Sequence, residues 1–301
     1  LSAALALALA ACSQPPAPPA EPVAATPPAA PAPPAAPVPT AEEVFAAKMD
    51  AVLAGAQRSD ANKARDQYRH PKETLMFFGI QPNMTVVEVW PSAGWWTEIL
   101  APLLKDDGKY YAAWFATEWE KTPDFLKARE KEYDAMLAAR PDLYGKVVKT
   151  KLLAPQWVDI APKGSADMVL TFRNVHNWAK AGNAEAMFQA FWDALKPGGV
   201  LGVKDHRANP GTSFQQQIDS GYMTEEYVIS TAQKVGFKLV GWSEVNANAK
   251  DTKDHPFGVW TLPPALRSTP YGSKETDPGF DHSKYLSIGE SDRMTLRFVR
   301  P

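Results

Sequence analysis

Three groups of polar or titratable residues follow apolar segments of the chain, and their types suit ligand binding or proton transfer. The first group is Glu88, near the end of an apolar, β-branched run, with the turn Pro91, Ser92, Ala93 and Gly94. Apolar residues at helical spacing follow this turn, so it leads into a helix N-terminus. Free backbone N–H groups point outward at such a turn, and an acid beside them makes the crevice polar. The sequence therefore predicts a ligand site at Glu88 and the turn.

The second and third groups are Arg173, Asn174 and His176, and the pair Asp205 and His206. Each follows or ends a run predicted to form a parallel strand, and the carboxyl ends of such strands meet over one crevice. Histidine has an unperturbed pKa near neutrality, so His176 is a candidate general base toward a hydroxyl or amine. The alternative is a structural histidine that is hydrogen-bonded beside Trp178, since group transfer often needs positioning more than a base.

An alternation of strand and helix signals must position these residues. Apolar or alternating runs predict strands over residues 86–89, 108–115, 147–153, 166–172, 200–205, 237–245 and 293–299. Caps and helical spacing predict helices from Thr40, from Asp60 to about Tyr68, and over 71–78, 96–104, 123–140, 184–195 and 225–235. The pattern indicates an α/β domain with a mainly parallel sheet.

The motif at the first strand resembles a known family. Strand, Glu88, turn, Gly94 and helix are similar to the first motif of class I S-adenosylmethionine-dependent methyltransferases. The closest likeness is to predicted bacterial methyltransferases in which a Trp-Pro pair follows the acid, as Trp90-Pro91 does here. The resemblance runs from about Ala61 to the end and includes the turn Leu195-Lys196-Pro197-Gly198-Gly199. It implies a Rossmann-like seven-stranded sheet with helices on both faces and a last strand that inserts antiparallel between the fifth and sixth.

The resemblance also implies a cofactor and a distribution of roles. The cofactor is S-adenosyl-L-methionine, whose methyl group goes to an unidentified small-molecule acceptor. The residues expected to bind the cofactor are Glu88, Pro91, Ser92, Ala93, Gly94, Trp114, Phe115, Trp157 and Arg173, with the aromatic side chains near adenine. Those expected to face the acceptor and take part in catalysis are Asn174, His176, Asp205 and His206.

A second interpretation is a non-catalytic, ligand-binding lipoprotein of the cell envelope that keeps a methyltransferase fold. The family motif has three glycines in the turn, whereas Trp90, Ser92 and Gly94 occupy these places here. The predicted second strand ends in Trp114 and Phe115, where the family carries an acid for the ribose hydroxyls. An aromatic ring can stack on adenine, but it cannot accept hydrogen bonds from both hydroxyl groups.

Composition and spacing exclude some other functions. The net charge of -2 leaves no basic footprint, so nucleic acid is not an expected partner. An Asp-His pair occurs at Asp205-His206, Asp254-His255 and Asp281-His282. Adjacent residues on a strand point to opposite faces, and no His-x-x-x-His or paired-cysteine spacing is present. No metal site is therefore expected.

The N-terminal segment predicts an anchored protein. Leu1–Ala11 is like the apolar region of a secretory signal, and Leu9-Ala10-Ala11-Cys12 resembles a lipobox whose cysteine is lipidated. Ser13 favours sorting to the outer membrane. The expected domains are a signal remnant (1–12), a Pro/Ala-rich tether (13–40) and a methyltransferase-like domain (41–301). This domain contains an insert at 246–292, which we interpret as a lid. A chance Ala-rich stretch with a stray cysteine is the alternative to the lipobox.

Overall fold

The computed structural model describes residues 40–301, apart from residues 271 and 274. The predicted lipobox and the predicted tether up to residue 39 lie outside the described residues, so both stay predictions. Among the described helices, none combines the length and the apolar character that crossing a membrane requires.

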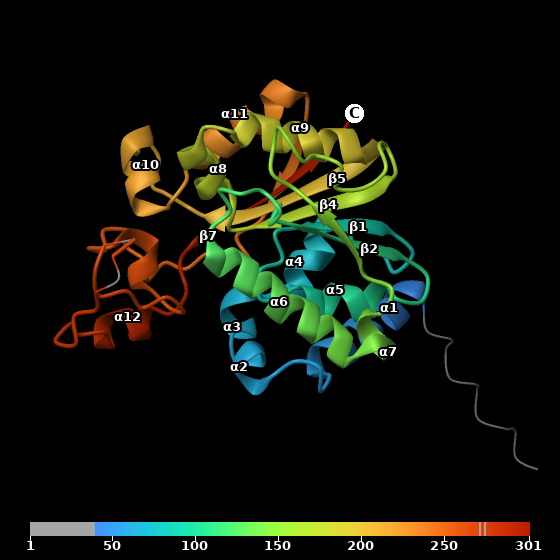
Figure 1. Cartoon of the computed structure of the whole chain (residues 1–301), viewed down its shortest axis with the longest axis horizontal. Helices are drawn as coiled ribbons and strands as arrows, with labels where there is room; N and C mark the ends of the chain where they lie inside the picture. The colour runs from blue at the N-terminus through green and yellow to red at the C-terminus, as the bar shows by residue number, and fades with distance from the viewer. Residues whose placement is uncertain (1–39, 271, 274) are drawn as a thin grey trace, which may run out of the picture. The chain divides into compact units, whose positions relative to one another are not determined.

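The described strands form one seven-stranded sheet, as predicted (Figure 1). They are β1 (Thr85–Val89), β2 (Lys109–Trp114), β3 (Val148–Lys151), β4 (Ala166–Phe172), β5 (Leu195–His206), β6 (Lys238–Trp242) and β7 (Arg293–Val299). The spatial order is β3-β2-β1-β4-β5-β7-β6. Neighbours from β3 to β5 are parallel, whereas β7 is antiparallel to both β5 and β6. The Rossmann-like prediction, with the last strand inserted between the fifth and sixth, is confirmed.

Helices cover both faces of this sheet (Figure 1). One face carries α1 (Ala41–Ala54), α4 (Pro71–Phe78), α5 (Thr97–Leu104), α6 (Asp124–Ala139) and α7 (Pro141–Tyr144). The opposite face carries α8 (Val175–Ala181), α9 (Ala184–Ala194) and α11 (Glu225–Val235). The short helices α2 (Asp60–Lys63), α3 (Asp66–Arg69), α10 (Phe214–Ser220) and α12 (Ser283–Ile288) complete the described set. The structure is a three-layered α/β domain.

Local signals explain where the first helices begin and end. Thr40 and Glu43 form the predicted capping box of α1. The helix predicted over 60–68 is wrong in part, because the segment divides into α2 and α3, and Ser59 rather than Asp60 caps it. Its end at His70 agrees with the prediction, since a proline disfavours helical backbone in the preceding residue.

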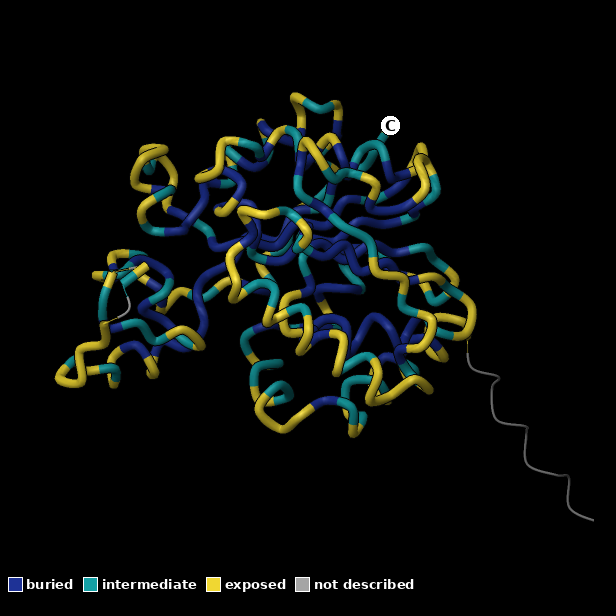
Figure 2. The backbone as a smooth tube through the Cα atoms, in the orientation of Figure 1, coloured by how far each residue is buried: buried dark blue, intermediate teal, exposed yellow. Residues whose placement is uncertain are grey.

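The core lies in two apolar layers, one on each side of the sheet, and Figure 2 shows the strands as the buried centre. Trp96, Ile99, Leu100, Leu103 and Leu104, predicted as the inward stripe of a helix, are all buried. Side chains of β1 alternate: Val87 and Val89 pack on the α8–α9 side, while Val86 packs on the α5 side. The same alternation places the carboxyl group of Glu88 on the α5 side.

The insert of residues 246–292 folds against the domain near the carboxyl ends of the strands. It contains a 3₁₀ helix, η1 (Gly258–Thr261), and α12. Asn246 donates hydrogen bonds to Thr74 and Thr295, and Asp251 accepts one from Tyr222. These buried contacts fix the base of the insert on the sheet. Opening and closing of the insert as a lid stays a prediction.

Candidate functional site

A cavity of about 360 Å³ lies at the carboxyl ends of β1 and β4, next to the predicted turn. We call it the turn cavity. The predicted site residues that line it are Glu88, Pro91, Ser92, Ala93, Phe115, Arg173 and Asn174. Its other lining residues are Arg65, Arg69, Trp90, Trp95, Trp96, Arg129, Phe172, Asn177 and Pro264. The structure thus brings together residues that sequence reasoning assigned to one crevice.

Three residues predicted to bind a cofactor do not line this cavity. Trp114 is completely buried and stacks on Tyr133 at 4.8 Å between ring centroids, because its place in β2 turns it toward the core. Trp157 pairs with Leu153 beyond the end of β3. Gly94 closes the turn with a φ of +78°, and a Cβ there would lie 2.6 Å from Met136. Gly94 shapes the turn, whereas the two tryptophans belong to the surrounding structure.

Two residues of the turn that are not glycine, Trp90 and Ser92, adopt the left-handed backbone conformation that glycine favours. Trp90 has a φ of 51° and Ser92 a φ of 54°. Left-handed backbone of this kind costs about 1–2 kcal/mol per residue with a side chain. The Trp90 indole stacks on Phe115 at 4.1 Å and donates a hydrogen bond to the carbonyl oxygen of Leu152. These contacts hold Trp90 in place, and such strained positions cluster at functional sites.

Glu88 reaches the cavity from a buried hydrogen-bond network. Its Oε2 accepts hydrogen bonds from the hydroxyl groups of Tyr110 and Thr97, and Thr97 also bonds Tyr133 at 3.0 Å. Among the described residues, none donates to its Oε1, which leaves that oxygen for a ligand. Burial raises the pKa of Glu88 to about 7, although the two hydrogen bonds act in the opposite direction. The carboxyl group of Glu88 therefore changes between its neutral and its ionised form near neutral pH.

Arginine side chains dominate the opposite side of the turn cavity. Arg65 and Arg69 both pair with the buried Glu290, at 2.6 and 3.1 Å, and Arg293 pairs with the same carboxylate. Burial opposes ionisation of Glu290, but the surrounding arginines outweigh it and lower the pKa of this carboxyl. Glu290 therefore stays charged and is shared by three cations.

A buried lysine, Lys204, lies next to these arginines. Its ammonium group donates to the carbonyl oxygen of Arg69 at 3.0 Å and lies 4.6 Å from the ring centroid of Trp96. Burial, and then Arg293 and Arg69, lower the pKa of Lys204 well below its ordinary value. Burial is the main cause of this low pKa, and the neighbouring arginines add to it.

A second cavity of about 210 Å³ adjoins the first and contains the predicted histidines. We call it the histidine cavity. Arg173, Asn177 and Pro264 line both cavities, and the rest of the lining is His176, His206, Val259, Trp260, Leu262, Pro263 and Ala265. The insert thus supplies most of one wall. Sequence analysis assigned both histidines to the acceptor side, and they do lie next to the turn cavity.

Asp205 contacts both histidines: its carboxylate lies next to the ring of His176 and accepts a hydrogen bond from the backbone of His206. Its carboxylate accepts from the backbone N–H groups of Val175 and His206, at 2.6 and 2.7 Å, and lies 3.1 Å from His176 Nδ1. His206 Nδ1 lies 2.5 Å from the hydroxyl of Ser291. Burial, and then His176 and Arg173, lower the pKa of His206 well below its ordinary value, so its ring is neutral.

Potential ligand atoms of His176, Asp205 and His206 lie within 4.8 Å of one another. The expectation that Asp205 and His206 point to opposite faces is wrong for this pair, which stands at the end of β5. However, both carboxylate oxygens of Asp205 already accept hydrogen bonds, and Arg173 adds positive charge. These features disfavour a cation, and the absence of a metal site stays a prediction.

Asn174 holds the ends of two strands together. Its amide nitrogen donates to the carbonyl oxygen of Val89 at 3.1 Å and to Thr171 at 3.2 Å. The side chain is buried at the boundary between β1 and β4. Its observed contacts are therefore structural.

Sequence analysis did not predict the arginine cluster around Glu290. One signal was present: Arg65 and Arg69 are four residues apart, the spacing that puts two side chains on one helix face. No local signal pointed to Glu290, which is 225 residues from Arg65.

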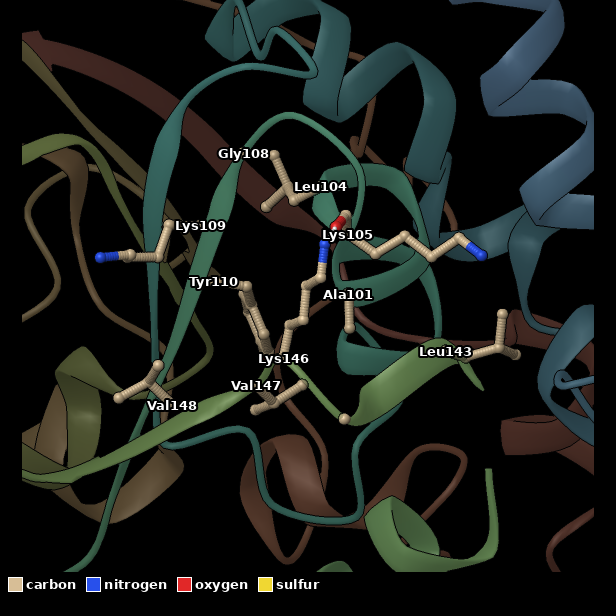
Figure 3. A pocket seen from close by; sticks show the side chains of 11 residues that line it. Ala101, Leu104, Lys105, Gly108, Lys109, Tyr110, Leu143, Lys146, Val147 and Val148 are labelled. Carbon is tan, nitrogen blue, oxygen red and sulfur yellow. Dashed lines mark hydrogen bonds between the residues drawn. The ribbon is translucent and has the colours of Figure 1, made fainter. Parts of the chain in front are cut away.

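A third cavity, of about 400 Å³, lies at the other end of the strands (Figure 3). Its lining combines apolar residues with Lys105, Lys109 and Lys146, and Lys146 donates to the carbonyl oxygen of Lys105 at 2.8 Å. None of the predicted site residues lines it. Ligands of open α/β sheets bind at the carboxyl ends of the strands, so this cavity is not the candidate site.

Comparison with known proteins supports the fold. The [4+2]-cyclase SpnF matches with a TM-score of 0.54 and 14% identity, over 88% of this chain and 98% of that one. A SAM dependent methyltransferase from Aquifex aeolicus matches with a TM-score of 0.47 and 18% identity, over 61% and 87% of the two chains. Neither a protein-family profile nor a curated protein matches the sequence. The chain shares its Rossmann-like fold with SpnF, and fold alone does not define a reaction.

Proposed function

We propose that this protein is an S-adenosyl-L-methionine-dependent methyltransferase that acts on a small molecule. One observation carries the proposal: Glu88 and the turn Pro91–Ala93 line a cavity that adjoins a second cavity with two histidines. Adjacent sites for a donor and an acceptor are what group transfer requires. The motif resemblance of the turn and the shared fold support the same reaction class.

The methionine end of the cofactor fits the turn cavity well. Glu88 offers a free Oε1 and a charge that forms near neutral pH, next to the backbone of Ser92 and Ala93. The adenosine end fits in part, because Phe115 offers a ring face but the end of β2 carries no acid. Glu118 follows, and it is paired with Lys151 instead. When bound, the cofactor supplies a methyl group on a positively charged sulfur.

The chain's own residues would then position the acceptor and receive its proton. His176 Nδ1 faces the Asp205 carboxylate, which orients the ring and leaves Nε2 as the proton acceptor. Apolar residues of the insert, among them Val259 and Leu262, line the histidine cavity opposite the strand ends. Asp205 acts through His176 as a positioning residue.

Binding of S-adenosyl-L-methionine should depend on pH through Glu88. A cationic ligand favours the ionised carboxylate, which is about one tenth populated at pH 6 and nine tenths at pH 8 if its pKa is about 7. We therefore expect the affinity to be about tenfold higher at pH 8 than at pH 6. Calorimetric titration at both pH values measures this change.

Glu88→Gln provides the control for that titration. The glutamine cannot ionise, so it should remove the part of the pH dependence that Glu88 causes and weaken binding by about 1.5–3 kcal/mol at pH 8. Titration of the ligand's own amino group affects both proteins equally and cancels in the comparison. If the two proteins bind with the same affinity and pH profile, the cofactor does not sit at this turn.

A second candidate function is non-catalytic ligand binding, and the contacts of Trp90 favour it. Its indole stacks on one face of the Phe115 ring and donates a hydrogen bond to the carbonyl oxygen of Leu152, so that face is not open to adenine. A fold neighbour named as a [4+2]-cyclase also indicates that this architecture is not restricted to one reaction. A parent protein that binds no S-adenosyl-L-methionine at millimolar concentration would favour this candidate.

We also propose that the protein is lipid-anchored on the periplasmic side of a bacterial envelope, through Cys12. The support is the sequence Leu9-Ala10-Ala11-Cys12 followed by Pro/Ala-rich chain. Cys12→Ser should convert a membrane-sedimenting protein into a soluble or unprocessed one, measured by fractionation and acyl labelling in the native host. Unchanged sedimentation of the variant, with no acyl label on the parent, would contradict the anchor.

A further inference from the structure

We propose that the histidine cavity binds a small organic anion, a carboxylate or a phosphate, whose charge pairs with Arg173. The identification of this anion as the methyl acceptor rests on the proposed function, whereas the binding itself does not. The argument uses the partners of Arg173, the charges around the two cavities and the shape of the wall opposite.

Arg173 is partly buried, and its positive charge forms no ion pair with a described residue. Its backbone N–H donates to the carbonyl oxygen of Lys204 at 2.7 Å, and its φ of 61° is a left-handed conformation. Within the part of the chain that the structure describes, no residue accepts a hydrogen bond from its guanidinium group. Burial, and then Arg293, lower the pKa of Arg173 to about 10, so it remains protonated at neutral pH. A partly buried cation whose side chain has no hydrogen-bond acceptor in the protein favours an anionic ligand, which would supply that acceptor.

The residues that line the turn cavity also carry a net positive charge. The described lining of the turn cavity contains the arginines Arg65, Arg69, Arg129 and Arg173 and one carboxyl group, Glu88. Glu290, behind this lining, is already shared by Arg65, Arg69 and Arg293. One Nη2 of Arg65 and one of Arg69 are buried without a hydrogen-bond partner. The excess positive charge favours an anion over a neutral ligand.

The histidine cavity also specifies the rest of the ligand. Its charged lining residue is Arg173, while the neutral His206 and the amide of Asn177 offer further polar contacts. The wall from the insert is apolar and includes Val259, Trp260 and Leu262. The carboxylate of Asp205 lies beneath the histidines and is occupied by backbone N–H groups. The ligand should therefore have an anionic group at one end and an apolar body toward the insert.

Three probes of matched size test this inference: benzoate, phenyl phosphate and the neutral benzamide. Each is titrated into the full chain by calorimetry, with and without S-adenosyl-L-methionine, and thermal melting is recorded in parallel. At least one anion should bind and raise the melting temperature, whereas benzamide should bind at least tenfold more weakly. The stronger anion identifies the preferred group as a carboxylate or a phosphate.

Arg173→Asn tests the residue directly, because asparagine tolerates left-handed backbone and removes the charge. It should weaken binding of the preferred anion by about ten- to a hundredfold. Arg140→Gln is the matched control: it removes one positive charge from an exposed arginine that pairs with Asp142, and it should leave binding unchanged. Circular dichroism confirms that both variants are folded.

The proposal is wrong if benzamide binds as tightly as benzoate, if neither anion binds at millimolar concentration, or if Arg173→Asn binds as the parent does. It is also wrong if manganese chloride, and not the anions, stabilises the protein through His206. Anion binding without any binding of S-adenosyl-L-methionine would leave this site standing and remove the proposed methyl transfer. Binding of S-adenosyl-L-methionine without binding of either anion would keep the proposed methyl transfer and remove this anion site.

Discussion

Glu290→Gln should lower the free energy of unfolding by about 3–5 kcal/mol, the typical loss when one partner of a buried ion pair is removed. Glu290 is 2% exposed and pairs with Arg65, Arg69 and Arg293. Glutamine has a similar shape but no charge, so the substitution leaves three arginines, two of them deeply buried, without their counter-ion. Few other single changes in the described structure would unbalance so much charge.

Urea unfolding of the parent and variant measures this loss, and Glu244→Gln is the matched control. Glu244 forms a two-pronged pair with Arg207, but its side chain is 61% exposed, so its removal should cost at most about 1 kcal/mol. The low pKa of Glu290 also predicts a pH dependence. Its stabilisation is complete above the ordinary carboxyl pKa and is lost as the pH falls toward the lower pKa of the folded state. Equal losses in the two variants would contradict the account of the cluster.

Glu88→Gln should have an effect on stability that grows with pH. The pKa of Glu88 is about 7 in the folded protein and near 4.5 when the chain is unfolded. The folded state therefore binds more protons between these values, and the parent loses stability as the pH rises from 4.5 to 7. A shift of this size corresponds to about 3 kcal/mol, which is fully lost above pH 7. Glutamine avoids this loss and can still accept the hydrogen bonds of Tyr110 and Thr97.

Denaturant titrations at pH 4.5, 6 and 8 separate the two proteins. The stability of the variant relative to the parent should rise by about 3 kcal/mol across this range. Glu120→Gln, at an exposed position with no ion pair among the described residues, should show no such trend. A parallel pH dependence in parent and Glu88→Gln would mean that the carboxyl of Glu88 ionises normally in the folded protein.

Much of the fold could be predicted because its signals are local. Thr40 with Glu43, and Thr224 before its helix, are caps that need only a few neighbouring residues, and the structure contains both. The apolar runs of the strands need only their own composition. Since strand order follows from the motif resemblance, the position of the final strand was also predictable.

The site residues that follow the end of a strand could be predicted from the sequence. Those whose position depends on a contact with a residue far away in the sequence could not. Glu88 and Arg173 each end or follow an apolar run, so their place over the crevice could be inferred. Trp114 was misjudged because one residue along a strand reverses the face on which a side chain lies. The convergence of His206 with Asp205 depends on local geometry at the end of β5, which no spacing rule describes.

The long separation between Glu290 and its arginines has a consequence for biosynthesis. The ribosome makes Arg65 first, and 225 residues later it adds the carboxylate that pairs with it. At about 5–20 residues per second, this interval lasts roughly 10–45 seconds. During that time Arg65 and Arg69 lack the counter-ion that they have in the folded protein. A translation product that ends before Glu290 would therefore keep Arg65 and Arg69 without a counter-ion. Such a product should be retained by chaperones or bind acidic molecules.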